Sequence, residues 1–293
     1  MRQMSFMKCD LIHSIRERMP SLSKSQKAIA VYILEHYEKA AYMTAAKLGE
    51  YAGVSESTVV RFAIEMGFEG YPGMQEALRD VVRTCLTAVQ RMEITNDRLG
   101  NHDVLDRVLE DDIERIRSTQ EQIDRAQFAQ AVDAICRAKS VYIAGVRATS
   151  SLASFLYFNC NLIFPDVKLI VTTSGNEMFE QMLHIGAGDV LIAISFPRYS
   201  KRVIDAARYA SENGAHIVAV TDSVQSPLAE HADSVLTAKS DMVSFIDSLV
   251  APLSLLNALV VSIVQKKQSE LAPTFDRLER IWDAYEVYEK EDD

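Results

Sequence analysis

The segment from Thr44 to Tyr71, TAAKLGEYAGVSESTVVRFAIEMGFEGY, is the part of the chain whose residue order most constrains the fold. It reads as two short helices joined by a tight turn. Thr44 offers an N-cap oxygen to a first helix, predicted over Thr44–Tyr51. Gly53 permits the positive φ of a sharp turn, and Ser55 caps a second helix that begins at once. This order predicts a helix-turn-helix, with an ordinary helical hairpin as the plainer alternative.

The second helix carries short polar side chains in its first turn and a cation one turn later, while Val59 and Phe62 supply its core-facing side. In a recognition helix, the N-terminal residues meet base edges, and the next turn meets phosphate or guanine. We therefore expect double-stranded operator DNA as a partner. The residues predicted to contact it are Thr44, Ser55, Glu56, Ser57, Thr58 and Arg61.

Three parts of this segment resemble the helix-turn-helix domain of the MurR/RpiR family of bacterial transcription regulators. They are Thr44-Ala45, the run Val54–Phe62 and the closing Gly67-Phe68-Glu69-Gly70-Tyr71-Pro72. The resemblance implies a DNA-binding domain, which we expect over residues 1–83. Apolar periodicity predicts further helices over Leu11–Met19, Ser25–His36 and Met74–Val89. The first two would pack on the helical pair and make an all-α domain, and the third would lead away from it.

The formal net charge of −10 over 293 residues runs against binding a polyanion. The charge is uneven, however, because residues 1–83 hold 11 Lys and Arg against 10 Asp and Glu, or +1, which leaves −11 for the remainder. Only the face that contacts DNA needs to be positive, and dimerisation doubles that face. We expect a homodimer or homotetramer.

The four cysteines, Cys9, Cys85, Cys136 and Cys160, lie far apart, and no histidine stands at metal-ligand spacing. This favours reduced thiols in a cytoplasm, with no metal site and no cofactor. The N-terminus mixes charges into its apolar residues and lacks a signal-peptide core. The most apolar run, Leu249–Val264, has about 16 residues, short of the roughly 20 that a membrane span needs. We predict a buried helix there and a cytoplasmic protein without a membrane segment.

From Ser140 onward, short apolar runs alternate with helical segments. The runs that read as strands are Val141–Ala144, Val167–Val171, Val190–Ser195, Ile217–Val220 and Ser234–Thr237. The predicted helices lie near Ser150–Ile163, Glu177–His184, Ser200–Asn213 and Phe245–Lys266. Apolar strands that alternate with helices predict an α/β domain whose parallel five-stranded sheet is flanked by helices.

Two of the predicted strand-to-helix turns, Gly145–Ser151 and Ser195–Lys201, are rich in hydroxyls and cations. Ligands of open parallel sheets lie at the carboxyl ends of strands, where helix N-termini direct N–H groups at anions. Helix capping explains either turn alone, but two such turns on neighbouring strands predict a phosphate site. The residues predicted to bind the effector are Gly145, Arg147, Thr149, Ser150, Ser195, Arg198, Ser200 and Lys201.

The stretch from Ser140 to about Lys266 resembles the sugar isomerase (SIS) domain that MurR/RpiR regulators carry after their DNA-binding domain. The resemblance implies that the domain binds a phosphosugar or a related anionic carbohydrate metabolite and modulates operator binding in response. The first SIS loop usually reads Gly-x-Gly-x-Ser, so that Arg147 occupies the second glycine and Thr149 the serine.

The second SIS loop usually reads Ser-x-Ser-Gly-x-Thr. Here Ser195 and Ser200 match the outer hydroxyls, while Pro197 and Arg198 replace the middle Ser-Gly. Two positions that normally let the backbone approach a phosphate are thus occupied by arginine. We expect an anionic ligand that is held more by guanidinium groups and less by bare backbone. In the alternative interpretation, both arginines pair with Asp or Glu in a site that is no longer used.

An enzyme of the phosphosugar isomerase type with an accessory DNA-binding domain is the alternative function. Such an enzyme needs a general base, for which the candidates are Glu177, Glu180, His184, His216 and His231. None of them stands in a recognisable catalytic motif, so we expect no catalytic residue. A fused DNA-binding domain makes sense of ligand binding without turnover. A purely architectural protein would leave the paired hydroxyl turns unexplained.

We expect a DNA-binding domain at residues 1–83, a helical linker at 84–126, a SIS domain at 127–266 and a C-terminal helix at 267–293. The polar stretch Thr95–Asn101 is the predicted flexible joint. A predicted helix over Asp103–Ile123 has an apolar stripe that either packs on the core or forms a dimer seam. The C-terminal helix, with Trp282, Tyr285 and Tyr288 at helical spacing, docks either on the body or on a partner subunit.

Overall fold

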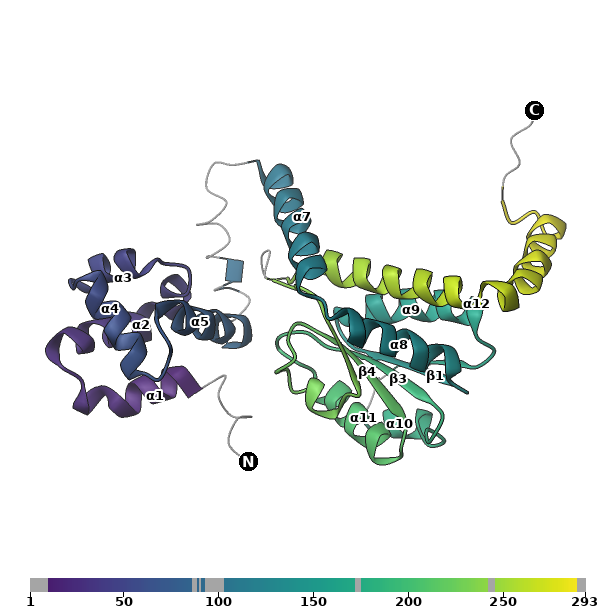
Figure 1. The fold of residues 1–293 in the computed structure, drawn as a ribbon, viewed down its shortest axis with the longest axis horizontal. Coiled ribbons are helices and arrows are strands. Elements are labelled where there is room, and N and C mark those ends of the chain that lie inside the picture. Colours follow the sequence, from purple (N-terminus) through teal and green to yellow (C-terminus); the bar gives the residue numbers. More distant parts are fainter. Residues whose placement is uncertain are drawn as a thin grey trace. The chain divides into compact units, whose positions relative to one another are not determined.

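The computed structural model describes residues 10–85, 89, 91–92, 103–171, 175–241 and 246–288. Two compact units make up the chain, residues 1–111 with 241–248 and residues 112–240 with 249–293. The first unit holds the helical N-terminal domain, and the second holds the sheet (Figure 1). The predicted joint at Thr95–Asn101 lies outside the described residues.

The N-terminal domain is built from helices. They are α1 (Asp10–Arg18), the 3-10 turn η1 (Met19–Ser21), α2 (Lys24–Ala40), α3 (Ala45–Ala52), α4 (Glu56–Glu65) and α5 (Tyr71–Cys85). A capping box starts α2, because the Ser23 hydroxyl accepts from the Gln26 backbone N–H and the Gln26 side chain accepts from that of Ser23. Ile33, Leu48 and Phe62 are fully buried in one core, as expected for an all-α domain.

Two helix boundaries in this domain differ from the prediction. The predicted end of α2 at His36 is a kink, where φ is −139° and ψ is 37°, and the helix continues to Ala40. The prediction that α5 begins at Met74 is wrong, because the helix begins at Tyr71. Pro72 is tolerated there, since the N–H groups of a first helical turn have no intrahelical acceptor. Beyond Cys85, most of the predicted helix lies outside the described residues.

The second unit is an α/β sandwich on a five-stranded sheet. Its strands are β1 (Val141–Gly145), β2 (Val167–Ile170), β3 (Val190–Ile194), β4 (His216–Thr221) and β5 (Ser234–Thr237). Every strand pair is parallel, and the order is β2-β1-β3-β4-β5. All residues of β1 and β3 are buried, which explains why these strands are apolar throughout. The predicted fold class is confirmed.

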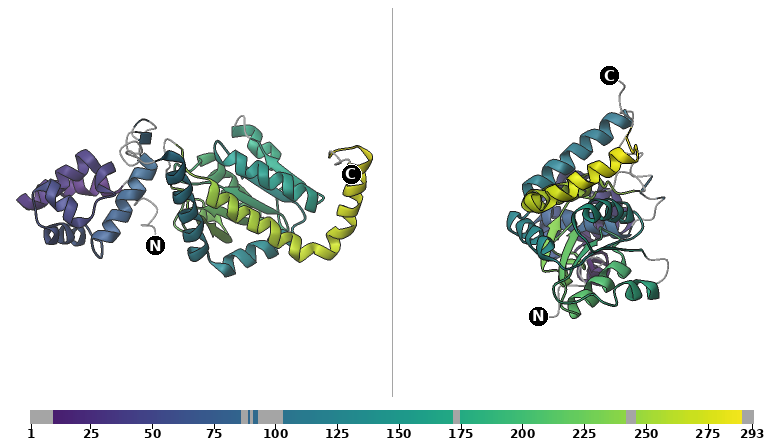
Figure 2. Two further views of the ribbon diagram at one scale, coloured as in Figure 1. Left: turned by 90° about the horizontal axis from the view of Figure 1, so that it is seen from above. Right: turned by 90° about the vertical axis from the view of Figure 1, so that its right-hand side faces the viewer.

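Helices cover both faces of this sheet. They are α8 (Arg125–Arg137), α9 (Thr149–Ile163), α10 (Gly175–Gln181), α11 (Lys201–Glu212) and α12 (Val250–Ala284), and the 3-10 turn η2 (Ala229–His231) follows β4. Figures 1 and 2 show α8, α9 and α12 over one face and α10 and α11 over the other. The sequence analysis missed α8, which Asp124 caps by accepting from the N–H groups of Ala126 and Gln127.

The helix α12 is longer than predicted. The expected end at Lys266 is wrong, because the helix continues through Pro273 to Ala284. The prediction of a buried helix is confirmed for its first half, where Leu256, Leu259 and Ile263 are fully buried. Among the described residues, α12 is the one helix long and apolar enough, by length and composition, to cross a membrane.

The apolar stripe of α7 (Val104–Gln122) does not pack on the core of its own chain. Val104, Ile113 and Ile116 are 56 %, 57 % and 37 % exposed, so the core-packing interpretation is wrong for them. Only Ile123, just past the helix end, packs against the SIS core. The dimer-seam alternative therefore stays a prediction.

Candidate functional site

The helix-turn-helix begins with the cap and the turn that its sequence predicts. The Thr44 side chain accepts from the Lys47 backbone N–H at 3.2 Å and caps α3. Gly53 follows α3 with φ 67° and ψ 35°, in the left-handed region that favours glycine. Ser55 is the N-cap residue of α4, but its hydroxyl lies 3.0 Å from that of Ser57 and 2.8 Å from that of Thr58 and caps no backbone N–H.

One side of α4 packs and the other faces outward. Val59, Phe62 and Ala63 are buried in the helical core. Of the residues predicted to contact DNA, Thr58 is half-buried, and the exposed ones are Thr44, Ser55, Glu56, Ser57 and Arg61. The Arg61 Nε donates to the Ser57 carbonyl at 3.3 Å, one turn back on the same helix. Hydroxyls, one carboxylate and one guanidinium are therefore exposed on α4 and its N-cap, while the contacts of these residues with DNA stay a prediction.

Side chains of α5 hold the loop that leads into α3. The Tyr71 hydroxyl and the Gln75 amide both donate to the Met43 carbonyl, at 2.7 and 2.6 Å, and the Arg79 Nε donates to the Ala41 carbonyl at 3.2 Å. Burial raises the pKa of Tyr71 to about 12. The sequence analysis did not assign this role. Its only signal was the Gly67–Pro72 signature, which contains Tyr71.

The two predicted effector loops lie side by side in the SIS domain. They follow β1 and β3, which are hydrogen-bonded neighbours at the point where the strand order reverses. In open α/β sheets this switch point is where ligands bind. The loops are tied together by Thr149, whose Oγ1 lies 2.9 Å from the Val146 carbonyl oxygen and 3.1 Å from that of Ile194, the last residue of β3.

Both arginines that replace the usual small loop residues have positive φ. Arg147 has φ 57° and Arg198 has φ 67°, and among the described residues only Glu286 shares this property without being glycine. A left-handed conformation costs a residue with a Cβ roughly 1–2 kcal/mol. Both side chains are exposed, and neither forms an ion pair with a described residue. The loops thus keep the backbone shape of glycine and add a guanidinium to each.

The hydroxyls of these loops mostly bond to the protein itself. The Ser150 hydroxyl donates to the Arg147 carbonyl at 2.6 Å, and the Ser195 hydroxyl accepts from the Ser200 N–H at 3.1 Å. Lys201 is exposed at the first position of α11. Ser150 and Ser195 therefore shape the loops through hydrogen bonds within the chain, although no side chain caps the N-terminus of α9 or α11, and the cations stand outside this hydrogen-bonding network.

A cavity of about 250 Å³ opens between the first loop and the end of β2. Three of the predicted effector-binding residues line it, Gly145, Arg147 and Ser150. Gly145 leaves no room for a side chain, because an added Cβ would lie 2.7 Å from the Thr149 carbonyl oxygen. The sequence analysis missed the other lining residues, which are Val146, Ser154, Leu169, Ile170 and Val171. The described lining includes none of the four predicted residues of the second loop, Ser195, Arg198, Ser200 and Lys201.

None of the candidate general bases lies among the described residues of this lining. Glu177, Glu180 and His184 are exposed on or just after α10, and His231 lies in η2. His216 starts β4, at the opposite end of the strand from the effector loops, and its Nε2 lies 3.2 Å from the Ser234 hydroxyl. The residues that the structure describes also contain no cluster of His, Cys, Asp or Glu side chains that could hold a metal ion.

Comparison with family models assigns both domains. A model of the helix-turn-helix domain of the rpiR family matches residues 9–84, and a model of the SIS domain matches residues 134–262. The transcriptional regulator HexR of Pseudomonas aeruginosa is 25 % identical over 280 residues, which are 92 % of this chain and 94 % of HexR. HexR of Escherichia coli K12 is 24 % identical over 284 residues, 94 % of each chain.

Solved structures with the same fold cover one or both domains. The NanR protein of Vibrio vulnificus, solved in complex with ManNAc-6P, matches 94 % of this chain and 98 % of its own, with 24 % identity and a TM-score of 0.58. The sugar isomerase domain of an RpiR transcription factor from Sphaerobacter thermophilus matches 59 % of this chain and 97 % of its own, with 28 % identity and a TM-score of 0.56. With its helix-turn-helix domain and the SIS domain that follows, the chain belongs to the MurR/RpiR family of transcription regulators.

Proposed function

We propose that this regulator binds operator DNA with α4 and that its SIS domain senses a phosphosugar or a related anionic carbohydrate metabolite. The observation that carries the proposal is the pair of arginines, Arg147 and Arg198, held at positive φ at the carboxyl ends of two neighbouring strands. Residues in strained backbone conformations cluster at ligand sites, where the side chain has a use that offsets the strain.

A guanidinium binds phosphate or carboxylate through two parallel N–H···O bonds. Ion pairing within the chain would occupy these donors, but neither arginine has such a partner among the described residues. The cavity beside Arg147 is also lined by Ser150 and Ser154, and the Ser150 hydroxyl oxygen can accept a hydrogen bond from a sugar. The NanR complex with ManNAc-6P, a phosphorylated sugar, supports the assignment of the ligand class to this fold.

Binding of the metabolite would regulate DNA contact by a population shift. A ligand that binds one arrangement of two linked chains better than another changes the spacing of the two recognition helices. Half-sites on DNA are read about 34 Å apart, so a change in spacing weakens or strengthens operator binding. We expect the regulator to work in the cytoplasm as a homodimer or a homotetramer.

The isomerase alternative has less support. Glu177, Glu180, His184, His216 and His231 lie outside the described lining of the cavity, so no proposed base reaches a sugar carbon there. The relatives are named transcriptional regulators.

Selection of duplex DNA from a random pool, with and without a mixture of sugar phosphates, tests the proposal. We expect a two-fold symmetric motif whose recovery changes with the mixture. Arg61→Ala should lose the motif while keeping any thermal stabilisation by the sugar phosphates, and Arg208→Ala, at an exposed arginine of α11, is the matched control. Turnover of a sugar phosphate without enrichment of any sequence would replace the regulator proposal with the enzyme.

A further inference from the structure

The second half of α12 carries apolar side chains that the SIS domain does not cover. Leu271 is the last buried residue of the helix. Beyond it, Ile281, Tyr285 and Tyr288 are 41 %, 78 % and 64 % exposed, and the Trp282 ring packs edge-on against that of Tyr288 at 5.4 Å. Two exposed tyrosines beside a tryptophan form an unusually apolar end for a projecting helix.

This end cannot fold back onto the face from which its helix starts. The first half of α12 is part of the sheet-covering layer, and Trp282 lies 20 residues beyond Ser262 in the same helix. At a rise of 1.5 Å per residue, that separation is roughly 30 Å. Figures 1 and 2 show the second half of α12 bending away from the SIS domain. The interpretation in which the C-terminal helix docks on its own body therefore holds for Leu271 and Phe275, which pack on the core of the domain, and not for Trp282 and the residues beyond it.

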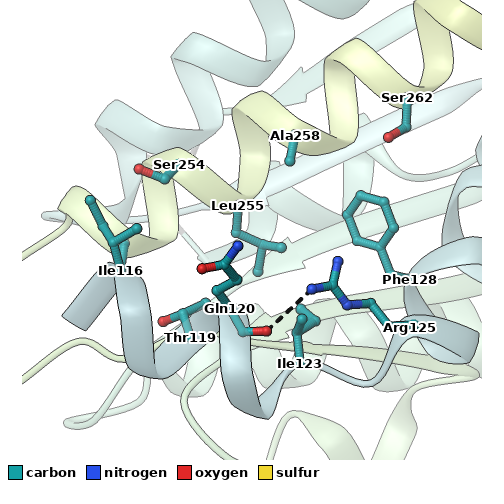
Figure 3. Close-up of a pocket in the computed structure, with 11 residues that line it drawn as sticks. Ile116, Thr119, Gln120, Ile123, Arg125, Phe128, Ser254, Leu255, Ala258 and Ser262 are labelled. Atoms are coloured by element: carbon teal, nitrogen blue, oxygen red, sulfur yellow. Dashed lines mark hydrogen bonds between the residues drawn. The ribbon is translucent and has the colours of Figure 1, made fainter. Parts of the chain in front are cut away.

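The SIS domain also carries an open groove of about 410 Å³ between α7, α8 and the first half of α12 (Figure 3). Its walls are mainly apolar and include Ile116, Phe128 and Leu255. Arg125 is the one charged side chain among the described lining residues, and its Nη2 donates to the Gln120 carbonyl at 3.3 Å. This volume lies in the range of pockets that take an apolar anchor group.

The groove and the projecting helix end complement each other. Aromatic anchors that enter a preformed pocket are the usual energetic centre of a protein interface, and the helix end offers Trp282 with Tyr285. Within residues 278–288 the sequence holds three acidic residues against one basic residue, a net charge of −2, whereas the only described charge in the groove is the cation Arg125. Opposite charges at the rim fix the orientation of a partner.

We propose that residues 278–288 of one chain dock in the α7–α8–α12 groove of a second copy of the chain, and that the exchange is reciprocal. Because the same two patches meet twice about a two-fold axis, the assembly closes as a dimer. The exchange covers Ile116 and the aromatic helix end at once.

Fluorescence offers a direct readout, because Trp282 is the only tryptophan in the chain. We expect its emission in the full-length protein to be blue-shifted at micromolar concentration and to move to the red on dilution, in step with the change from dimer to monomer in light scattering. Ile116→Asp should raise the dissociation constant of the dimer at least tenfold. Val224→Asp, an exposed position after β4, should leave it unchanged.

Mixing two variants separates docking from misfolding. The Ile116→Asp chain keeps its helix end, and the Trp282→Ala chain keeps its groove but emits no tryptophan fluorescence. Adding the second chain should shift the emission of the first to the blue, because its helix end finds an intact groove. Ser254→Glu, an exposed substitution in the groove wall, should weaken the same dimer if Ile116→Asp does not fold.

Three results would overturn the proposal. The first is a tryptophan emission of the mixed Ile116→Asp and Trp282→Ala chains that equals the sum of the emissions of the two chains measured separately. The second is a disulfide between Ser262→Cys and Tyr285→Cys that forms within one chain rather than between two, with Ser211→Cys on α11 as the control position. The third is a blue shift that phospholipid vesicles cause equally in wild type and Ile116→Asp, which would assign the helix end to a membrane surface.

Discussion

The tight turns of the two domains reach the same backbone conformation with different residues. In the DNA-binding domain, the left-handed positions between α3 and α4 and after α4 are the glycines Gly53 and Gly67. In the SIS domain, the left-handed positions of the two effector loops are Arg147 and Arg198. The left-handed conformation costs the two glycines no steric strain, whereas it costs each of the two arginines about 1–2 kcal/mol.

We propose that this difference separates turns that serve the architecture from turns that serve a ligand. A turn that only redirects the chain uses the residue that tolerates positive φ, and nothing approaches Gly53 within 4 Å of an added Cβ. A turn that keeps arginine in that conformation supports the hypothesis that the guanidinium contacts a ligand.

The largest expected loss of stability comes from replacing a glycine whose side-chain position is blocked by neighbouring atoms rather than by a positive φ. Gly145 has no positive φ, but a Cβ there would lie 2.7 Å from the Thr149 carbonyl oxygen and 3.0 Å from the Ala153 Cβ. We expect Gly145→Ala to lower the free energy of unfolding of the SIS domain by about 3 kcal/mol, as overpacking does. Urea unfolding followed by circular dichroism measures the loss. A loss below that of Gly53→Ala would contradict the close packing of this loop.

Replacing both strained arginines tests the comparison directly. Arg147→Gly with Arg198→Gly should remove charged hydrogen bonds of about 1.5–3 kcal/mol each and weaken binding of hexose 6-phosphates at least tenfold. The same variant should melt at a higher temperature than wild type, because the strain is relieved. Thermal shift with and without the sugar phosphates reports both changes. An unaltered ligand response would show that the arginines do not contact the effector.

The matching substitution in the DNA-binding domain should only destabilise. Gly53→Ala meets no neighbouring atom, so we expect a loss of about 1 kcal/mol that comes from the positive φ alone. Operator binding should fall in proportion to the unfolded fraction. A loss of DNA affinity in fully folded protein would mean that the turn itself contacts DNA, and titration at low temperature distinguishes the two outcomes.

The smallest expected effect concerns the side chain that holds the loop before α3. Burial raises the pKa of Tyr71 from 10.0 to about 12, so the folded domain favours the neutral hydroxyl. Its contribution to stability is complete below pH 10 and is lost as the pH rises towards 12. Denaturant unfolding between pH 9 and 12 should show this decline in wild type. Tyr71→Phe should be less stable below pH 10 and lack that part of the decline.

Patterns of apolar residues predicted the sheet well, because β1 and β3 are buried on both faces and therefore tolerate no polar residue. The turn at Gly53 could also be predicted from the sequence, since few residues other than glycine adopt its positive φ. The length of α12 could not be predicted in the same way, because two consecutive lysines, Lys266 and Lys267, are typical of the last turn of a helix. The helix continues because no residue there stops it, and Pro273 is accommodated inside it.

The candidate site was predictable only in its loops. Which way a hydroxyl points depends on contacts between distant segments, as with Thr149, which reaches the end of β3 across 45 positions in the sequence. Ser154 and Val171 join the cavity through the packing of α9 and β2 against the first loop. No local pattern marks such residues. The carbonyl contacts of Tyr71, Gln75 and Arg79 have the same origin, because they join α5 to a loop about 30 residues earlier.

The length of the helix α12 means that a small tilt of its first half displaces its far end by a larger distance. Its first half packs against α9, whose first residue, Thr149, belongs to the effector loop. Its second half, Lys267–Ala284, is an arm of roughly 27 Å at 1.5 Å per residue. A tilt of about 10° at the base of such an arm moves its far end by about 5 Å. A small displacement beside the proposed effector loops would thereby become a step the size of a helical turn at Trp282.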